Sequence, residues 1–262
     1  MKKKFIALMA IAAFLTGCSD IVAQTKEPVD YVNPYIGNIS HLLVPTFATI
    51  QLPNSMLRVY PARADYTSEY VNGLPVIVTN HRERSAFSIS PSQREHLQPV
   101  VAVNYDNEVI TPYSFDVELD DNTMRARYAV YRQSAVYELN FYKKDKPVYV
   151  IINSANGMIR IGQNYVSGYQ QLNDNTRVYI YLETETAPMT TGILAADGFD
   201  GRTSMAQGNN ACAVLRYKDG TEKVRLRYGV SFISEEQAHK NLMREQNSYD
   251  VDKVAARGRK VW

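Results

Sequence analysis

Two pairs of carboxylates in this sequence have a spacing that hydrolysis of a glycosidic bond could use. Glu183 and Glu185 form one pair, and Asp116 and Glu118 form the other. Residues i and i+2 of a strand point to the same face, about 7 Å apart. Inverting glycosidases need two carboxyl groups roughly 6.5–9.5 Å apart. Alternating charges are also typical of a solvated strand face, which is what we expect here, so no catalytic residue is assigned.

The other reactive residue types show no catalytic or metal-binding arrangement. Three serines, at positions 85, 88 and 90, lack the strand-to-helix turn of a nucleophile elbow. Cys212 lies in the apolar stretch NACAVL and is expected to be a small buried side chain rather than a nucleophile. No metal site is predicted, because the four histidines lack the spacing of metal ligands. They are His41, His81, His96 and His239.

A third group of residues could bind a sugar. Sugar sites combine planar surfaces with fixed donors and acceptors, and arginine presents a rigid fork to hydroxyls or to a charged substituent. The alternative is that Arg58 and Arg63 form surface ion pairs with Asp65 or Glu69. The candidate substrate-binding residues are His41, Arg58, Tyr60, Arg63, His81, Arg82 and Glu83, with Arg84 beside them.

The N-terminus has the features of a secretory leader. Three lysines are followed by an apolar run over residues 5–15, which is shorter than the about 20 residues of a membrane-spanning helix. The run ends in Leu-Thr-Gly-Cys, which matches a lipoprotein cleavage box. We therefore expect a signal peptide over residues 1–17, lipidation of Cys18 and a polar tether over residues 18–27. The alternative is an ordinary signal peptide. A bacterial cell-envelope location and a membrane partner follow from the lipid anchor.

Charge and length limit the remaining possibilities. The formal net charge is +2, and three of the positive charges belong to the leader lysines. No basic stripe remains, so nucleic acid is not expected as a partner. Lipidation of Cys18 would leave only Cys212, which cannot form an internal disulfide. The mature length suffices for one large all-β domain or two small ones.

The elements that must position these residues are predicted to be strands. From residue 47 onward, apolar and polar residues alternate with period two, and Asn, Asp and Gly separate the runs, as in the turn expected at Asn156-Gly157. No strands alternate with long helices, which argues against a doubly wound α/β fold. We predict an all-β fold over residues 28–233, a large two-sheet antiparallel sandwich. The expected strands are 49–52, 75–79, 87–89, 100–105, 114–119, 123–131, 135–142, 148–153, 158–162, 165–170, 177–184, 192–196, 211–217 and 223–233.

The pattern changes to a helical one over residues 234–262. Ser234 and Gln237 form a capping-box pattern before a helix over residues 235–245. Asp250 is a suitable N-cap for a second helix, which continues to Trp262 without a stop signal. We therefore expect residues 234–262 to be a helical linker in a longer protein.

Two motifs in this chain resemble glycoside hydrolase family 92, the bacterial exo-α-mannosidase family. Residues 30–37 read DYVNPYIG, and the strand at residues 50–53 resembles the family's Val-Gln-Leu-Ser-Pro. At the other end, residues 224–242 read VRLRYGVSFISEEQAHKNL, followed by YDVDKV at 249–254 and Trp262. The resemblance covers the mature chain but only the N-terminal domain of the family.

The family resemblance implies a fold and a division of labour. It implies a supersandwich of the galactose-mutarotase type, joined in the whole enzyme to an (α/α)₆ barrel. In the family, the barrel supplies the general acid, the general base and the ligands of a calcium ion. No cofactor is therefore expected in this chain, and calcium is expected in the catalytic domain, which lies outside this sequence.

One part of the chain departs from the family pattern. The family's loops near the sugar are rich in Gly and His, whereas this chain has NISHLL at residues 38–43 and TNHRER at 79–84. His41 and His81 are the nearest counterparts. We expect a pocket-shaping sandwich domain of a divergent family 92 glycosidase that acts on an α-mannoside or related glycan, inactive by itself. The alternatives are a non-catalytic glycan-binding lipoprotein and a structural one.

Overall fold

We describe residues 26–38, 46–63, 67–79, 85–195 and 198–262 of a computed structural model of the chain. The chain divides into two units, Met1–Tyr31 and Val32–Trp262. In the first, the short 3-10 turn Pro28–Tyr31 is closed by a hydrogen bond of 2.9 Å from the Glu27 N–H to the Asp30 carboxylate. The expected signal peptide, Cys18 and most of the expected tether lie outside the described residues.

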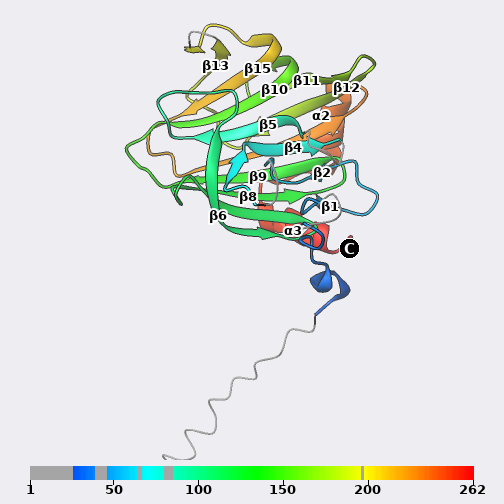
Figure 1. The fold of residues 1–262 in the computed structure, drawn as a ribbon. Helices are drawn as coiled ribbons and strands as arrows, with labels where there is room; N and C mark the ends of the chain where they lie inside the picture. Colours follow the sequence, from blue (N-terminus) through cyan, green and yellow to red (C-terminus); the bar gives the residue numbers. More distant parts are fainter. Residues whose placement is uncertain (1–25, 39–45, 64–66, 80–84, 196–197) are drawn as a thin grey trace, which may run out of the picture. The chain divides into compact units, whose positions relative to one another are not determined.

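The second unit consists mainly of antiparallel strands, as Figure 1 shows. Its strands follow the predicted alternation: in β7, for example, every second side chain is buried. The strands are β1 (Ile50–Gln51), β2 (Arg58–Val59), β3 (Tyr70–Asn72), β4 (Leu74–Val78), β5 (Ser85–Ser92), β6 (Ala102–Ile110), β7 (Ser114–Leu119), β8 (Met124–Val130), β9 (Ser134–Phe141), β10 (Val148–Ile161), β11 (Tyr165–Asn173), β12 (Thr176–Thr184), β13 (Thr190–Ala195), β14 (Gly198–Asp200), β15 (Met205–Tyr217) and β16 (Lys223–Ser231).

Apart from the pair β1–β2, the strands form one continuous hydrogen-bonded array, in which the long strand β10 joins two sheets. The first sheet has the order β4-β5-β10-β15-β13-β14, and the second has the order β11-β12-β16-β9-β8-β7-β6-β3. The ladder between β10 and β11 connects them at one margin. The short pair β1–β2 is separate from both sheets. The predicted two-sheet antiparallel sandwich is therefore confirmed.

Strand β10 corrects one sequence prediction. The Asn156-Gly157 pair was expected to be a turn between two strands, but both residues lie inside β10, paired with Asn209 and Gly208 of β15. Gly157 instead allows the neighbouring strand β11 to lie close to the backbone of β10. A Cβ there would stand 2.0 Å from the carbonyl oxygen of Tyr169 on β11. Glycine is the residue that allows another backbone to come so near.

A fork between strands forms along one edge of β10. The first half of β10 pairs with β5 as far as Asn153, and the second half pairs with β11 from Gly157. The backbone N–H groups of Phe87 and Ala155 lie at this fork. Both donate to the Oε1 atom of Gln170, at 2.8 and 3.1 Å. The buried Gln170 side chain thus supplies the acceptor that a regular ladder would have supplied.

Three buried tyrosines hold the two sheets together. Tyr128, Tyr137 and Tyr228 lie on β8, β9 and β16 and are fully buried. Tyr137 donates to the carbonyl of Pro75 at 2.8 Å and Tyr228 to the carbonyl of Val76 at 2.7 Å, both on β4 of the opposite sheet. The hydroxyls of Tyr128 and Tyr228 are 3.0 Å apart. Burial raises the pKa of Tyr137 and Tyr228 well above the ordinary value, so both stay protonated donors.

The outer face of the second sheet carries a ladder of charges. Acidic and basic side chains alternate from strand to strand, and three ion pairs of 2.7 Å join Arg125 to Asp116, Arg225 to Glu138, and Arg227 to Glu183. Burial alone would raise the pKa of Glu138, but the hydrogen bond from Arg225 and the charge of Lys223 bring it below its ordinary value. A register shift of one residue would put these charges into the core, so the ladder and the apolar face favour the same register.

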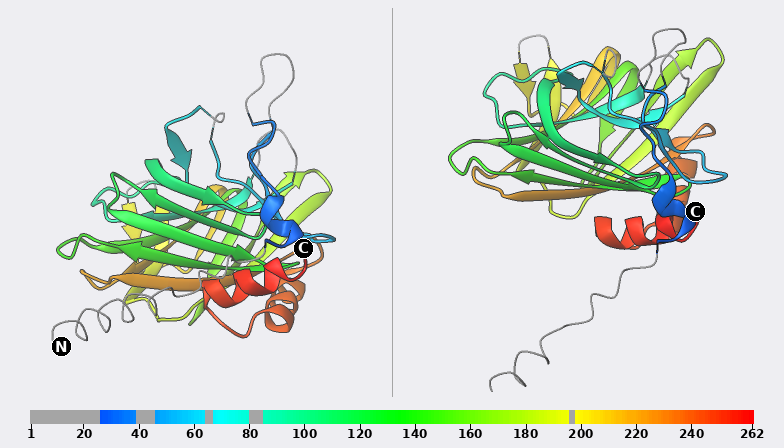
Figure 2. Two further views of the ribbon diagram at one scale, coloured as in Figure 1. Left: turned by 90° about the horizontal axis from the view of Figure 1, so that it is seen from below. Right: turned by 60° about the horizontal axis from the view of Figure 1, so that its bottom comes forward.

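Two helices cover part of this outer face, as Figure 2 shows. Helix α2 (Glu235–Glu245) packs on β16 and β12, and α3 (Val251–Arg259) packs on β8 and β9. The predicted caps are present. The Ser234 hydroxyl accepts from the Gln237 N–H at 3.0 Å, and the Asp250 carboxylate accepts from the N–H groups of residues 252 and 253. The predicted C-terminal helical segment is confirmed, but α3 ends at Arg259 and does not continue to Trp262 as expected.

The sequence prediction missed the shortest strands. Strands β2, β3 and β14 have only two or three residues each, which is too few to show alternation. Two extended runs were underestimated: β5 and β15 both begin before the predicted residue. These differences change lengths but not the architecture.

The fork yields a test of the fold. We expect Gln170→Leu to lower the free energy of unfolding by about 1–3 kcal/mol, because the buried N–H of Phe87 and the part-buried N–H of Ala155 lose their acceptor. Urea denaturation measures this change, and hydrogen exchange should accelerate at the amides of Phe87 and Ala155. Gln163→Leu, at an exposed position of the β10–β11 connection, is the control and should leave both readouts unchanged. Unaltered exchange in Gln170→Leu would contradict the role assigned to this side chain.

Candidate functional site

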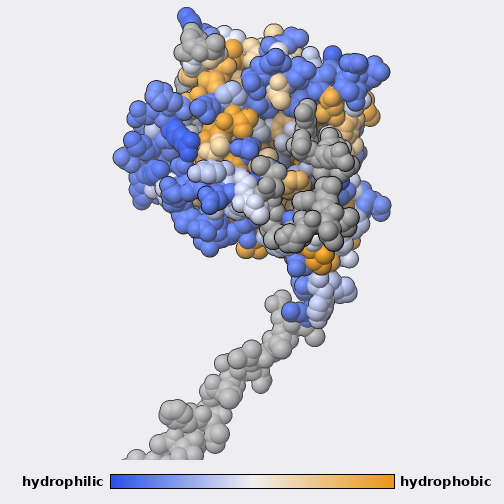
Figure 3. Space-filling view, in the orientation of Figure 1, coloured by the Kyte–Doolittle hydropathy of each residue, from blue (hydrophilic) through white to orange (hydrophobic). Residues whose placement is uncertain are grey.

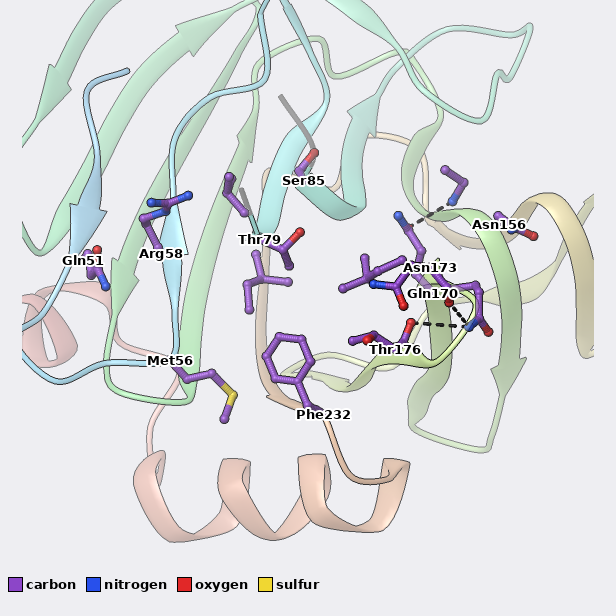
Figure 4. Close-up of a pocket in the computed structure, with 15 residues that line it drawn as sticks. Gln51, Met56, Arg58, Thr79, Ser85, Asn156, Gln170, Asn173, Thr176 and Phe232 are labelled. Carbon is purple, nitrogen blue, oxygen red and sulfur yellow. Dashed lines mark hydrogen bonds between the residues drawn. The ribbon is translucent and has the colours of Figure 1, made fainter. Parts of the chain in front are cut away.

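A cleft of about 930 Å³ lies between the β1–β2 pair and the β11–β12 hairpin. We call it the main cleft. Figure 4 shows Gln51 and Arg58 on one side of it and Gln170, Asn173 and Thr176 on the other. Strands β1 and β2 supply the first side, and the hairpin of β11 and β12 supplies the second. The lining residues are Gln51, Met56, Arg58, Ile77, Val78, Thr79, Ser85, Ala155, Asn156, Gln170, Gln171, Leu172, Asn173, Thr176 and Phe232.

The main cleft presents uncharged donors and acceptors together with one cation. Most of its polar side chains are amides or hydroxyls, and Arg58 is its one charged lining residue among the described ones. No hydrogen bond or ion pair joins the Arg58 guanidinium to another described residue. The aromatic ring of Phe232, 41% exposed, lies at the same cleft. A polyhydroxylated ligand could be bound by this lining, which offers amides, hydroxyls, one arginine and an exposed aromatic ring.

A second cavity of about 330 Å³ lies next to the main cleft. Both are lined by Ser85, Ala155 and Gln170, so the fork in the sheet separates them. The Tyr60 ring, which also lines the second cavity, stacks on Phe47 with centroids 4.4 Å apart. The full lining is Tyr60, Ala62, Arg63, Asn72, Ser85, Phe87, Ser88, Val100, Asn153, Ala155 and Gln170.

Arg63 is held in place in the wall of this second cavity. Its Nη2 atom lies 2.5 Å from the carboxylate of Glu108 on β6, and its Nη1 donates to the Tyr105 hydroxyl at 2.6 Å. Both charged side chains are nearly buried, at 2% and 9% exposure. Burial raises the pKa of Glu108, although the adjacent guanidinium opposes that effect. The sequence suggested a surface ion pair of Arg63 with Asp65 or Glu69; Asp65 lies outside the described residues, and the described ion pair of Arg63 is the buried one with Glu108.

The structure separates the sequence-predicted binding residues into two places. Arg58 lines the main cleft, whereas Tyr60 and Arg63 line the second cavity. The other predicted members lie outside the described residues, so their placement stays a prediction. They are His41, His81, Arg82 and Glu83, together with Arg84.

The carboxylate pairs and the cysteine considered for catalysis lie away from both cavities. Glu183, Glu185 and Asp116 bind arginines on the outer face, and Glu118 accepts a hydrogen bond from Asn107. Cys212 is fully buried, and burial raises its pKa to about 12, so the thiol is not a nucleophile. Among the described residues, no three His, Cys, Asp or Glu side chains are grouped to hold a metal ion.

The two remaining described histidines also lie away from both cavities. His96 is exposed in the segment between β5 and β6. His239 lies on α2 and packs against the Tyr181 ring, with centroids 4.2 Å apart. Neither histidine lines the main cleft or the second cavity.

Sequence reasoning missed most of the polar lining. Gln51, Asn156, Gln170 and Asn173 were not candidates, because an amide within a strand pattern carries no signal of its own. Asn156 was assigned to a turn, although strand β10 in fact presents it to the cleft. Phe232 was assigned to a strand and instead directly follows β16. Only the arrangement of the strands brings these residues together.

On the face shown in Figure 3, hydrophilic residues predominate and apolar patches interrupt them. Within the described ranges, no helix has the length and hydrophobicity that crossing a membrane requires. The most exposed large apolar side chain is Ile233, at 75%, next to Phe232 of the main cleft.

Solved structures share this fold. A family GH92 inverting mannosidase from Bacteroides thetaiotaomicron superposes with a TM-score of 0.77 and 24% identity, over 91% of this chain and 36% of that one. A family GH92 α-mannosidase from the same organism gives a TM-score of 0.77 and 18% identity, over 91% and 37%. A bacterial glucoamylase complexed with acarbose is more distant, with a TM-score of 0.52 and 12% identity over 86% and 39%. The chain thus spans little more than a third of these proteins.

The family assignment rests on the sequence pattern. The glycosyl hydrolase family 92 N-terminal domain matches residues 31–231, which is most of the chain. No curated protein matches the chain. The two GH92 structures agree with this pattern in fold. This chain belongs to glycoside hydrolase family 92, as its N-terminal sandwich domain.

Proposed function

We propose that this domain binds an α-mannoside or related glycan in the main cleft and shapes the sugar pocket of a family 92 glycosidase. The observation that supports this most directly is the composition of the cleft, in which Arg58 faces an amide-rich hairpin beside the ring of Phe232. Directed donors and acceptors give a polyhydroxylated ligand its orientation, and the ring offers an apolar surface for a sugar face. The two solved GH92 structures are mannosidases, which supports the choice of sugar.

The chemistry of hydrolysis is proposed to lie outside this domain. The family resemblance assigns the general acid, the general base and the calcium ligands to an (α/α)₆ barrel, and the GH92 relatives are nearly three times as long as the part matched here. In the described residues, no carboxylate lines the main cleft. The domain would therefore contribute binding and specificity, whereas a second domain breaks the bond.

The same inference covers the location of the protein. We propose that residues 1–17 are removed, that Cys18 is lipidated and that the domain is attached to a membrane of the bacterial cell envelope. The Leu-Thr-Gly-Cys sequence supports this proposal. A membrane-bound sandwich domain could meet glycans at the cell surface or in the periplasm.

Binding tests the main proposal. We expect methyl α-D-mannopyranoside to bind to the purified chain and Arg58→Ala to weaken binding about tenfold, which corresponds to the loss of one good hydrogen bond. Isothermal titration calorimetry measures both affinities. Arg202→Ala is the matched control, because that side chain is 93% exposed and lies outside the cleft. An Arg58→Ala chain that binds as well as the parent would contradict the placement of the site.

An activity assay tests the proposal that the catalytic groups lie outside this domain. The purified chain is expected to release no aryl leaving group from an aryl α-mannoside, with or without added calcium, since the described lining of the main cleft contains neither a carboxylate nor a histidine. Absorbance of the released phenol gives the rate. Appreciable turnover by this chain would show that the catalytic groups lie within it.

Anchoring can be tested at the cysteine. In bacteria, the full chain is expected to incorporate labelled palmitate and to sediment with membranes, and Cys18→Ser should abolish both because the acyl chains attach to that sulfur. Cys212→Ser serves as the control, since this residue is fully buried in the core. Retention of the label in Cys18→Ser would refute lipidation at this residue.

A further inference from the structure

The second cavity contains a buried hydroxyl without a partner. The Ser88 side chain lines this cavity, is 7% exposed and finds no hydrogen-bond partner for its Oγ atom in the described chain. An unsatisfied buried polar group costs about 1–3 kcal/mol, so native proteins leave few of them. A ligand hydroxyl in the cavity would satisfy this atom.

Asn153 faces Ser88 across the ladder between β10 and β5. Its Oδ1 accepts from the Cys212 thiol at 3.0 Å, which orients the amide. Within the described residues, its amino group makes no hydrogen bond, and the side chain lines the same cavity. Ser88 and Asn153 therefore form an adjacent pair of a hydroxyl and an amide donor, which can hydrogen-bond neighbouring hydroxyls of a sugar.

The charges around the cavity favour a neutral ligand. The Arg63 guanidinium in the wall lies 2.5 Å from the Glu108 carboxylate, so the pair adds no net charge. Tyr60, an uncharged residue stacked on Phe47, is also part of the lining of this cavity. The volume of about 330 Å³ falls at the lower end of the roughly 300–1,000 Å³ that small-molecule sites occupy. An anionic ligand would gain nothing from a cation that is already paired.

The two cavities are neighbours in the molecule. They share Ser85, Ala155 and Gln170, and Gln170 is fixed by its hydrogen bonds to the N–H groups of Phe87 and Ala155. Phe87 has a left-handed backbone, with φ 57°, at the point where the chain turns its N–H toward Gln170. This rigid boundary gives a ligand two adjacent compartments rather than one open groove.

We propose that the second cavity is a subsite for a neutral sugar unit, adjacent to a first unit in the main cleft, so that the ligand is at least a disaccharide. This inference rests on the proposed glycan-binding function and adds the length of the ligand to it. Ser88 and Asn153 bind hydroxyls of the second unit, and Tyr60 forms part of the wall of the cavity. Neither Ser88 nor Asn153 is predicted to contact a monosaccharide in the main cleft.

The experiment compares ligand lengths on the purified full chain. Calorimetric titrations with methyl α-D-mannopyranoside and with α-1,2-, α-1,3- and α-1,6-mannobiose give the affinities. We expect at least one disaccharide to bind about tenfold more tightly than the monosaccharide, since it adds at least one good hydrogen bond. In Ser88→Ala, this gain should be lost and the monosaccharide affinity unchanged. Ser88→Thr, which keeps the hydroxyl, should restore the gain.

Melting temperatures distinguish a ligand-binding role of Ser88 from a structural one. Ser88→Ala is expected to leave the melting temperature unchanged or to raise it, because the hydroxyl has no partner in the free protein. Ser90→Ala is the matched control, since its Oγ accepts from the Val101 N–H at 3.3 Å and it lies outside the cavity. That change should lower the melting temperature and keep the preference for the disaccharide.

The outcomes distinguish this inference from the proposed function. If the parent chain binds neither the monosaccharide nor any mannobiose, the glycan-binding proposal fails and this inference with it. If the monosaccharide binds as tightly as every disaccharide, or if Ser88→Ala keeps the disaccharide preference, only the subsite is overturned.

Discussion

The edge of β10 can pair with only one strand at a time, and the rest of the structure depends on how this limit is resolved. β5 occupies the edge as far as Asn153, and β11 occupies it from Gly157. Between them, the backbone N–H groups of Phe87, which is buried, and of Ala155, which is partly accessible, would lack an acceptor in a ladder, and a folded protein rarely leaves a buried N–H unpaired. One side-chain oxygen of Gln170 accepts from both. The strands diverge at this point, and both cavities are lined by residues of the divergence.

Close packing and hydrogen bonding then bring the two sheets together with a fixed separation. Tyr137 and Tyr228 extend from one sheet and donate to adjacent carbonyls of β4 in the other. A buried hydroxyl that found no partner would destabilise the core, so these bonds specify which strand lies opposite. The charge ladder on the outer face acts in the same direction, because it is compatible with one register only. The hydrogen bonds in the core and the ion pairs on the surface therefore favour the same strand pairing and register.

The site follows from this arrangement. Family 92 membership concerns the whole domain, whereas the main cleft is built from particular side chains that β1, β2 and the β11–β12 hairpin carry to its two sides. Arg63, a predicted binding residue, lines the second cavity, but its guanidinium forms a buried ion pair with Glu108 that is part of the folded structure. Ser88 shows the opposite case, a buried polar atom that contributes nothing to the folded state by itself. Such atoms mark where a ligand would complete the structure.

The sequence by itself determined the fold class, most strands, both helices with their caps, and the family. These properties depend on local periodicity and on short motifs, as in β7 and at Ser234, where each residue's neighbours along the chain decide the outcome. The tertiary structure alone decided the site. Arg58, Asn156 and Phe232 are distant in sequence and meet only because β10 runs unbroken through both of its pairings. Local pattern cannot reveal which edges pair, because hydrogen bonds between strands join residues that are far apart in the chain.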